Sequence, residues 1–478
     1  MTAEAGAAFF AARFGVDAQR CDELLGRALE RGGDYADLFF EYSEQRRLAL
    51  SEQQVRTAGS TVLQGLGVRV VSGESVGYAY TEQLDPASLR AAVDTAASVA
   101  KSGAPLVVPV RRVPVAQQYP AALALAEPAG ALALLERADA AARAAGSSIR
   151  NVEVDLSQQA RQILVATSEG RLAGDSQPMV RLVVSALSER DGDRQQGFEG
   201  KAGRAGLEFF SGERAAEAMG RRAAEEAIRQ HEAVEAPAGF LPVVLAAGQS
   251  GVWLHEAVGH GLEADFNRRG LSTYSGRIGQ QVASPLVTVV DDGTVPGLNG
   301  SLNVDDEGQE PRLNVLIERG VLRGYMHDWQ SARGYGLPAS GNGRRQDFRH
   351  APMPRMTTTY TLAGETPPEE IIRAVDYGVY CVSFSGGQVD IASGDYTFAT
   401  LEAYLIEHGR ITAPIRTVNL IGNGPDSLTR VTLVGNDLQI SEIAGMCGKG
   451  GKGAQWVPVG VGLPTVLVDG ITVGGTKR

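Results

Sequence analysis

The alternating stretches ADLFFEYSEQRRLALSEQQV (residues 36–55) and STVLQGLGVRVVSGESVGYAYTEQL (residues 60–84) decide the fold of the N-terminal half. Apolar and polar side chains alternate along both, and glycine-containing breaks interrupt them. This pattern predicts three strands joined by tight turns. A helix is predicted before them at residues 18–32. Asp85 and Pro86 start another helix after them, because proline is tolerated in the first helical turn.

The same order of strands and then a helix returns further along the chain. An alanine-rich helix is predicted at 126–146, alternating strands follow it, and a long helix follows those at 212–233. The repeat suggests two related units of antiparallel strands with packed helices. We therefore predict an N-terminal α+β domain at 1–234, with possible sub-units 1–115 and 116–234.

The second half has a different composition. Beyond the linker-like segment EAPAGF (235–240), Gly, Val and Thr become frequent and short strand-like runs multiply. Only two helices are predicted there, at 250–263 and 367–378, and the first directly follows the strand LPVVLAA (241–247). We predict a mainly β C-terminal domain at 240–478 and an α+β fold class for the whole chain.

Composition and charge restrict the class of protein. The chain has 478 residues, 43% of them apolar, and a net charge of −11 that is spread along its length. This charge argues against nucleic acid or an anionic membrane as the main partner. No apolar run approaches the ~20 residues that span a bilayer. Three cysteines are too few for a disulfide framework and favour the cytoplasm, with Cys21 and Cys381 expected to be buried and inert.

The stretch HEAVGHGLEADF (255–266) resembles a zinc-protease helix with one residue too many. In H-E-x-x-H the two histidines lie four positions apart on one helical face, whereas His255 and His260 are five apart. Residues five apart on a regular helix differ by about 140°. An inserted π-turn would return both imidazoles to one face. Gly259 and Gly261 would give the backbone the freedom to form it.

Two residues are candidates for a third metal ligand. Glu263, three positions after His260, would lie near the same helical face. Cys447 lies in the glycine-rich loop GMCGKGGKGAQ, where Lys449 and Lys452 would lower the pKa of its thiol.

The chemistry of such a site would follow that of zinc. Two imidazoles and a third ligand leave one position for water, whose pKa falls to roughly 7 on Zn²⁺. Glu256 would accept the proton of that water and pass it to a leaving amine.

Two other features have simpler explanations. HEAVEA, which begins at His231, has the same first four letters but no second histidine, so we predict solvated surface there. The loop after Cys447 fits no G-x-x-x-x-G-K-[ST] register, so it is not predicted to bind a nucleotide.

Several blocks in the second half together resemble the TldD/PmbA family of metallopeptidases, in its metal-bearing TldD type. They are HEAVGHGLEADFNRRG, DDGTVPGLNGSLNVDDEGQE, SGNGRR, PMPRMT, SFSGGQVD, SGDYTFA and GMCGKGG followed by VPVGVGLPTVLVDGITVGGT, and they occur in the order of the family. The stretch GKGGKGAQW after Cys447 is longer than the family pattern leads us to expect. By position, the resemblance implies that His255, His260 and Cys447 bind Zn²⁺ and that Glu256 is catalytic.

The resemblance also implies a substrate and a partner. Family members cleave extended or unfolded peptides, held by strand addition in a cavity between two subunits, so Gly386, Gly387 and Gly448 become candidates for substrate binding. The dimer would pair this chain with a metal-free paralogue or with itself. Two alternatives remain open: a non-catalytic peptide-binding scaffold, and a metal-dependent hydrolase of a non-peptide substrate.

Overall fold

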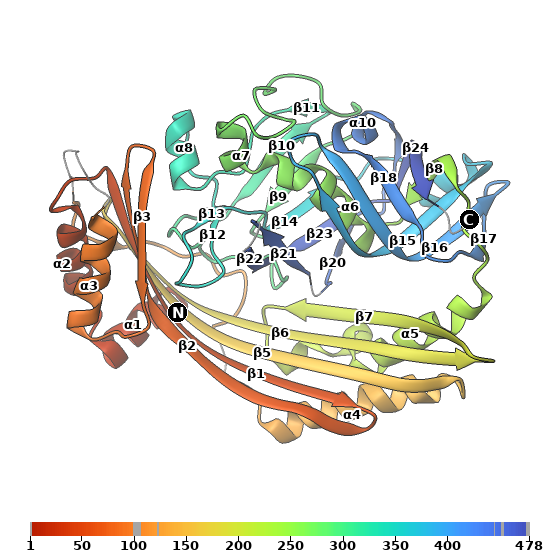
Figure 1. Cartoon of the computed structure of the whole chain (residues 1–478), viewed down its shortest axis with the longest axis horizontal. Helices are drawn as coiled ribbons and strands as arrows, with labels where there is room; N and C mark the ends of the chain where they lie inside the picture. The colour runs from red at the N-terminus through yellow and green to blue at the C-terminus, as the bar shows by residue number, and fades with distance from the viewer. Residues whose placement is uncertain (1, 99–106, 122–123, 444, 451–453, 475–478) are drawn as a thin grey trace.

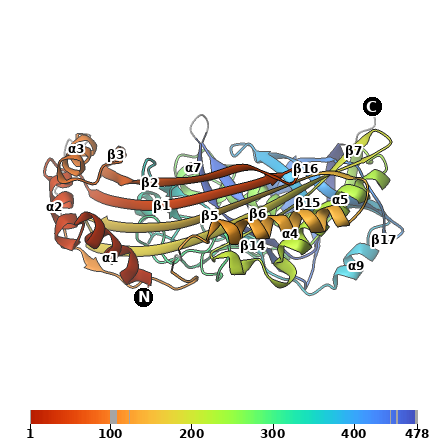
Figure 2. The ribbon, with the colours of Figure 1, turned by 90° about the horizontal axis from the view of Figure 1, so that it is seen from below.

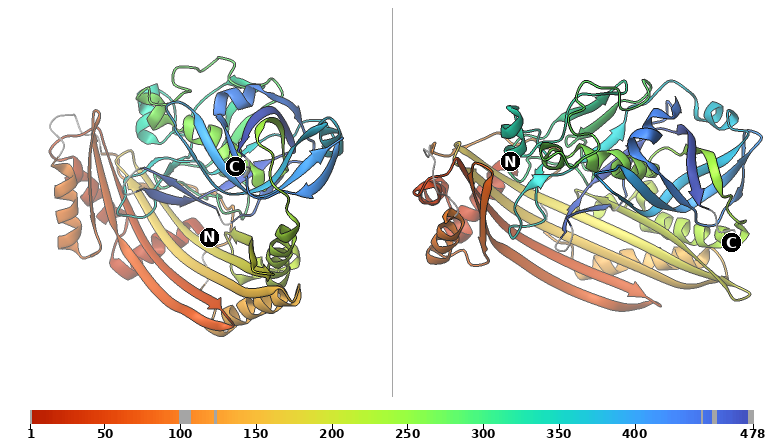
Figure 3. Two further views of the ribbon diagram at one scale, coloured as in Figure 1. Left: turned by 45° about the vertical axis from the view of Figure 1, so that its right-hand side comes forward. Right: turned by 45° about the horizontal axis from the view of Figure 1, so that its top comes forward.

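The computed structural model describes residues 2–98, 107–121, 124–443, 445–450 and 454–474. Its α+β fold has two main parts (Figure 1). A long, curved sheet from the first half lies beneath a second half that is built mainly of shorter strands, as Figure 3 shows in two further views.

One seven-stranded sheet contains the strands of both predicted N-terminal sub-units, in the order β3-β2-β1-β5-β6, with β4 and β7 both paired to β6. The strands are β1 (Tyr35–Ser51), β2 (Gln54–Ser72), β3 (Ser75–Thr81), β4 (Arg111–Arg112), β5 (Ile149–Thr167), β6 (Arg171–Arg190) and β7 (Asp193–Gly203). The three strands predicted over 36–84 are confirmed. Antiparallel pairing of β1 with β5 joins the two predicted sub-units in this sheet. The predicted domain boundary at residue 234 stays a prediction.

The helices of this half all pack on one face of the sheet. They are α1 (Thr2–Phe14), α2 (Ala18–Leu29), α3 (Pro86–Ala97), α4 (Pro128–Ala144) and α5 (Ala216–Arg229), and Figure 2 shows α4 lying across the underside. Alternation along β1 explains the two faces. Leu38 and Phe40 join the core beneath α1–α3, whereas Phe39 packs toward the second half with Val304 and Phe348.

The second half has two larger sheets. One follows the order β11-β10-β9-β14-β23-β20; the other follows β15-β8-β24-β18-β16-β17 and closes on itself, because β15 also pairs with β16. Their strands are β8 (Gly239–Leu245), β9 (Val289–Asp292), β10 (Leu313–Glu318), β11 (Val321–Leu322), β14 (Thr358–Thr361), β15 (Tyr377–Val389), β16 (Asp395–Glu407), β17 (Arg410–Pro414), β18 (Asn419–Asn423), β19 (Val431–Val434, paired with β24), β20 (Gln439–Ser441), β23 (Gly460–Leu463) and β24 (Val466–Gly474).

Two small hairpins and five short helices complete this half. They are β12 (Gly343–Arg344) with β13 (Met353–Pro354), β21 (Met446–Lys449) with β22 (Gln455–Pro458), and α6 (Val252–Leu254), α7 (Ala264–Arg268), α8 (Trp329–Tyr335), α9 (Pro368–Arg373) and α10 (Gly424–Thr429). The helix predicted at 367–378 is α9, and α8 and α10 were not predicted. Among the described residues, no helix is long and apolar enough to cross a membrane.

The predicted helix at 250–263 is a sequence of short turns rather than one regular helix. A 3₁₀ turn (Gln249–Gly251) leads into α6, a π-helical turn (His255–Gly259) follows, and a second 3₁₀ turn (His260–Leu262) ends the segment. Its apolar side chains, among them Trp253 and Val258, are buried in a core shared with both larger sheets. The segment is therefore fixed in the centre of the second half.

Candidate metal centre

The π-turn brings the two histidines together. The N–H of His260 donates to the carbonyl of His255, which is the i→i+5 bond of a π-helix, and the ring centroids lie 5.1 Å apart. The widened turn predicted from the five-residue spacing is confirmed. Both side chains are buried, at 4% and 5% exposure.

The two glycines beside His260 are needed for space, not for backbone freedom. Gly259 has ordinary helical angles, with φ −55° and ψ −51°, so the expected role of a flexible backbone is wrong. A Cβ at Gly259 would collide with Sδ of Met356, and a Cβ at Gly261 would lie 2.7 Å from Cδ2 of Tyr274. Close packing of neighbouring segments against the turn excludes a side chain at both positions.

Cys447 completes a cluster of three donor atoms. It lies on β21, and its Sγ is 3.1 Å from Nε2 of His255 and 3.2 Å from Nε2 of His260. The three donor atoms all lie within 4.8 Å of one another, and all three side chains are buried. Two imidazole nitrogens and a thiol form a donor set that suits Zn²⁺.

The neighbouring imidazoles favour the thiolate that a metal requires. Burial alone would raise the pKa of Cys447, but the charges of and hydrogen bonds from His260 and His255 outweigh it and hold that pKa well below its usual value. Lys449 does not contribute as expected, because its ammonium group binds the carboxylates of Glu263 and Asp265 instead of the thiol. Lys452 lies outside the described residues.

Glu263 lies behind His260 and not among the three converging donors. Its Oε2 is 3.0 Å from Nδ1 of His260 and 3.0 Å from Nζ of Lys449. A carboxylate at Nδ1 keeps the proton on that nitrogen and leaves the Nε2 lone pair directed at the cluster. Desolvation acts against the charge of Glu263, yet Lys449 and His260 hold its pKa well below the usual value.

Arg355 is a structural residue of this site that the sequence reasoning missed. Its guanidinium donates to the carbonyl of Cys447 at 2.7 Å and to that of Gln455 at 3.1 Å, which ties the two strands of the β21–β22 hairpin together. Its Nε also lies 3.6 Å from Glu263. The only sequence signal for Arg355 was its place in the block PMPRMT.

Glu256 borders the cluster from a more accessible position. Its side chain is 21% exposed, and its Oε2 lies 3.8 Å from Nε2 of His260. Desolvation raises the pKa of this carboxyl group, while the nearby His255 and His260 act in the opposite direction. A carboxylate placed beside the donor atoms and with a raised pKa is suited to exchanging a proton with a reacting group.

The three glycines predicted to bind substrate lie on two strands. Gly386 and Gly387 are exposed on β15, in the part that extends beyond its pairing with β8 at Val379–Cys381. Gly387 also has a structural role, because a Cβ there would collide with the ring of Phe398. Gly448 follows Cys447 on β21, and a Cβ there would lie 2.9 Å from the ring of Trp456.

His231 is not the solvated residue that was expected. Its side chain is only 4% exposed, its Nδ1 lies 2.8 Å from Oδ2 of Asp193, and its Nε2 lies 2.9 Å from Oγ of Ser188. The expectation was wrong because the β6–β7 turn folds back over the end of α5, a contact that local sequence does not show. Cys21 and Cys381 are buried and unpaired, as predicted.

Comparison with known proteins identifies the family. Three family models match consecutive parts of the chain: PmbA/TldA metallopeptidase domain 1 (36–100), central domain (123–230) and C-terminal domain (238–475). A "Metalloprotease TldD homolog" from Haemophilus influenzae is 42% identical over 94% of both chains. The chain belongs to the PmbA/TldD family.

More distant relatives agree with this membership. A "Metalloprotease" from Methanothermobacter thermautotrophicus is 31% identical over 93% of this chain and 96% of the relative. Among solved structures, TldE from Thermococcus kodakarensis matches with a TM-score of 0.73 at 18% identity, covering 96% of this chain and 100% of that one. A putative modulator of DNA gyrase from Thermotoga maritima matches with a TM-score of 0.76 at 20% identity, over 95% and 99%. The PmbA/TldD fold therefore spans nearly the whole chain.

Proposed function

We propose that this chain is a zinc-dependent metallopeptidase that hydrolyses bonds in extended or unfolded peptides. The observation that carries the proposal is the convergence of Nε2 of His255, Nε2 of His260 and Sγ of Cys447, with the carboxylate of Glu256 beside them. The metalloprotease names of its relatives support the same class of activity.

The residues present fit a zinc site. The two imidazoles and the thiolate would hold the ion, and Glu263 would orient His260 from behind. A zinc ion bound there would supply Lewis acidity and lower the pKa of a coordinated water to roughly 7.

Glu256 is the proposed general base and acid. Its carboxylate would take a proton from the attacking water and deliver it to the nitrogen of the leaving amine. The raised pKa of Glu256 favours both transfers, because its carboxylate binds a proton more readily than an ordinary glutamate does and exchanges that proton at a pH closer to neutral.

The decisive experiment compares the two HEAV segments of the chain. Glu256→Gln should retain zinc while the rate of peptide cleavage falls by about 10²–10⁴-fold. The matched control is Glu232→Gln in the HEAV segment at 231–234, whose glutamate is exposed and has no second histidine beside it, and this variant should cleave at the wild-type rate. Zinc content is measured by elemental analysis and cleavage by mass spectrometry of an unstructured peptide.

Three results would overturn the proposal. Full activity of Glu256→Gln would remove the assigned base. A wild-type protein that holds no zinc and cleaves no peptide, yet binds peptides, would be a non-catalytic scaffold; cleavage of other compounds alone would indicate a non-peptide hydrolase.

We further propose that the protein acts as a dimer, with a metal-free paralogue or with a second copy of itself. Leu271, Ile278 and Leu286 are 51%, 47% and 52% exposed, which is apolar surface that a second subunit would cover. Light scattering of the chain alone and mixed with the paralogue tests this, and a monomer in both samples contradicts it. The free, buried cysteines favour a reducing compartment such as the cytoplasm.

A further inference from the structure

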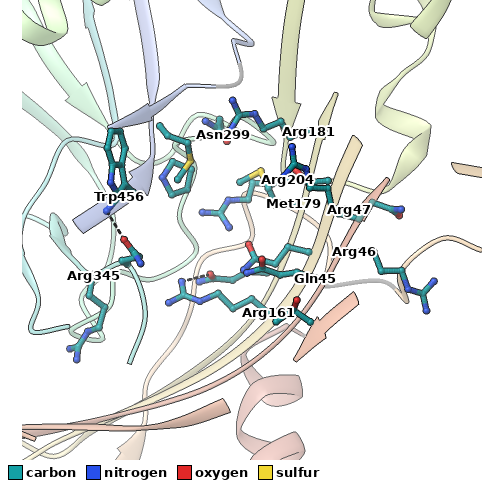
Figure 4. Close-up of a pocket in the computed structure, with 18 of the residues that line it drawn as sticks. Gln45, Arg46, Arg47, Arg161, Met179, Arg181, Arg204, Asn299, Arg345 and Trp456 are labelled. Atoms are coloured by element: carbon teal, nitrogen blue, oxygen red, sulfur yellow. Dashed lines mark hydrogen bonds between the residues drawn. The ribbon is translucent and has the colours of Figure 1, made fainter. Parts of the chain in front are cut away.

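A cavity of about 570 Å³ lies between the upper face of the long sheet and the second half. Strands β1, β2, β5 and β6 form one wall, and the β21–β22 hairpin contributes Met446, Trp456 and Pro458 to the other. Figure 4 shows Trp456 on one side and the sheet residues Arg47 and Met179 on the other. Because side chains alternate along β21, Met446 faces this cavity while Cys447 faces the metal centre on the reverse side of the hairpin.

Arginine dominates the lining, in a protein whose net charge is −11. Seven arginines line the cavity, namely Arg46, Arg47, Arg161, Arg181, Arg204, Arg344 and Arg345, against one carboxylate, Asp306. We call this site the arginine cavity. A concentration of one charge in a recess with low-dielectric walls attracts ligands of the opposite charge.

Three of these arginines already have carboxylate partners. Arg47 lies 2.6 Å from Asp155, and Arg161 lies 2.7 Å from Glu41. Arg345 lies 3.2 Å from Asp37. The other four, Arg46, Arg181, Arg204 and Arg344, have no carboxylate within 4.0 Å among the described residues.

Two of the uncompensated arginines are almost fully buried. Arg204 is 4% exposed, its guanidinium stacks at 5.2 Å on the ring of Tyr119, and its Nε has no hydrogen-bond partner among the described residues. Arg344 is 2% exposed, and among the described residues its guanidinium donates only to the carbonyls of Met356 and Pro458. Arginine is almost never buried without an anionic partner, because desolvating an unpaired charge is costly. The arginine cavity therefore presents buried positive charge that an anionic ligand would neutralise.

An open strand edge runs along the same cavity. β2 pairs with β3 only from Leu66 onward, so residues 54–64 have β1 on one side and no strand on the other among the described residues. Thr57, Gly59 and Thr61, which alternate along this edge, line the cavity. The backbone of a free strand edge can form hydrogen bonds with the backbone of an extended peptide. Side chains on the face of the sheet can then contact the side chains of that peptide.

We propose that the arginine cavity is an exosite for an acidic, extended segment of the peptide substrate. Carboxylates of the segment engage the unpaired guanidiniums of Arg181 and Arg204, and its backbone lies along the free edge of β2. This inference rests on the proposed peptidase function and adds a substrate preference to it: peptides with an acidic stretch away from the cleaved bond.

The test measures binding separately from cleavage. It uses the full-length Glu256→Gln protein and two fluorescent 12-residue peptides of otherwise uncharged sequence, one with four Glu and one with four Gln. Fluorescence anisotropy at low salt should give the Glu peptide at least about tenfold higher affinity, as two charge-assisted contacts predict, and salt should weaken that preference. Equal affinities for the two peptides would overturn the proposal.

Arg181 gives a variant that should remain folded, because its partly exposed side chain makes no ion pair among the described residues. Arg181→Gln should weaken binding of the Glu peptide about fivefold and leave that of the Gln peptide unchanged. The matched control, Arg190→Gln, changes an exposed arginine on the same strand and should bind like the parent protein. Wild-type affinity in Arg181→Gln, or an equal loss in Arg190→Gln, refutes the assignment.

Trp456 reports occupancy without a labelled peptide. The chain has three tryptophans, and Trp456 is 51% exposed whereas Trp253 and Trp329 are 1% and 6% exposed. Unlabelled Glu peptide should change the tryptophan emission, and Trp456→Phe should abolish that change. A single-stranded oligonucleotide that binds while the Glu peptide does not would overturn the peptide assignment. If the Glu peptide binds in a charge-dependent way but the wild-type protein cleaves no peptide, the anionic-peptide site is supported and the proposed peptidase activity is refuted.

Discussion

Replacing Glu263 with glutamine tests how the protein orients His260. In the structure, one oxygen of Glu263, Oε2, receives both Nδ1–H of His260 and Nζ of Lys449, each at 3.0 Å. An amide oxygen can occupy the same place and accept both hydrogen bonds. Its NH₂ group would then face Nε of Arg355, which lies 3.6 Å from Oε1. Glu263→Gln therefore keeps the shape of the side chain, removes its negative charge and adds one unfavourable contact, between its NH₂ group and Nε of Arg355.

The expected effect is a loss of metal affinity. Removing a partner of a metal-binding histidine weakens metal binding by about 10–100-fold, or roughly 1.4–2.8 kcal/mol. The loss of zinc affinity in Glu263→Gln should be about 10-fold, since the amide oxygen still accepts the hydrogen bond from His260. The loss in Glu263→Ala should be about 100-fold, because Nδ1–H of His260 is then left without its acceptor.

Zinc titration against a chromophoric chelator measures these affinities. The control is Asp265→Asn, because Asp265 also binds Lys449, at 2.8 Å, but has no contact with His260. If the orienting contact to the imidazole matters, Asp265→Asn keeps zinc affinity within about threefold of wild type. Wild-type affinity in Glu263→Gln, or an equal loss in Asp265→Asn, would show that His260 is not oriented in this way.

Two further predictions concern stability in denaturant. Gly259→Ala should lower the free energy of unfolding by about 1–3 kcal/mol, because the added Cβ would collide with Met356. The control is Gly26→Ala in helix α2, where the space around Cβ is open, and it should raise the free energy of unfolding by about 0.5–1 kcal/mol. Shifts of the same sign in both variants would contradict the packing argument. Burial raises the pKa of Glu226 to about 7 from an ordinary value of 4.5. The folded protein therefore holds a proton that the unfolded chain has lost, and stability falls by about 3 kcal/mol as pH rises through this range. Glu226→Gln, which keeps the bond from the N–H of Phe198, should remove that fall, and an unchanged pH profile would refute it.

Local patterns predicted the parts of the fold that depend on local burial. Alternation predicted β1 to β3 because one face of the sheet packs on helices and the other faces the second half. The five-residue spacing of His255 and His260 predicted the π-turn, since only a widened turn places both imidazoles on one side.

Contacts between distant segments could not be predicted in this way. The pairing of β1 with β5, which joins the two predicted sub-units in one sheet, depends on register across more than a hundred residues. The same holds for Arg355 and Lys449, whose roles depend on which carbonyls and carboxylates the folded chain brings to them. Glu263 was proposed as a ligand because its spacing fits the helical face, but the irregular turn after His260 places it behind the imidazole.

The order in which the chain is made delays the assembly of the cluster. Cys447 follows His260 by 187 residues, and β24, which fits between β8 and β18 in the closed sheet, comes later still. At roughly 5–20 residues per second, a ribosome needs about 10–40 s to travel from the second histidine to the cysteine. During that interval the imidazole pair has no thiolate, and the strand that completes its surroundings does not yet exist. A nascent chain therefore cannot form the three-donor site until residue 447 has been synthesised and has left the ribosome.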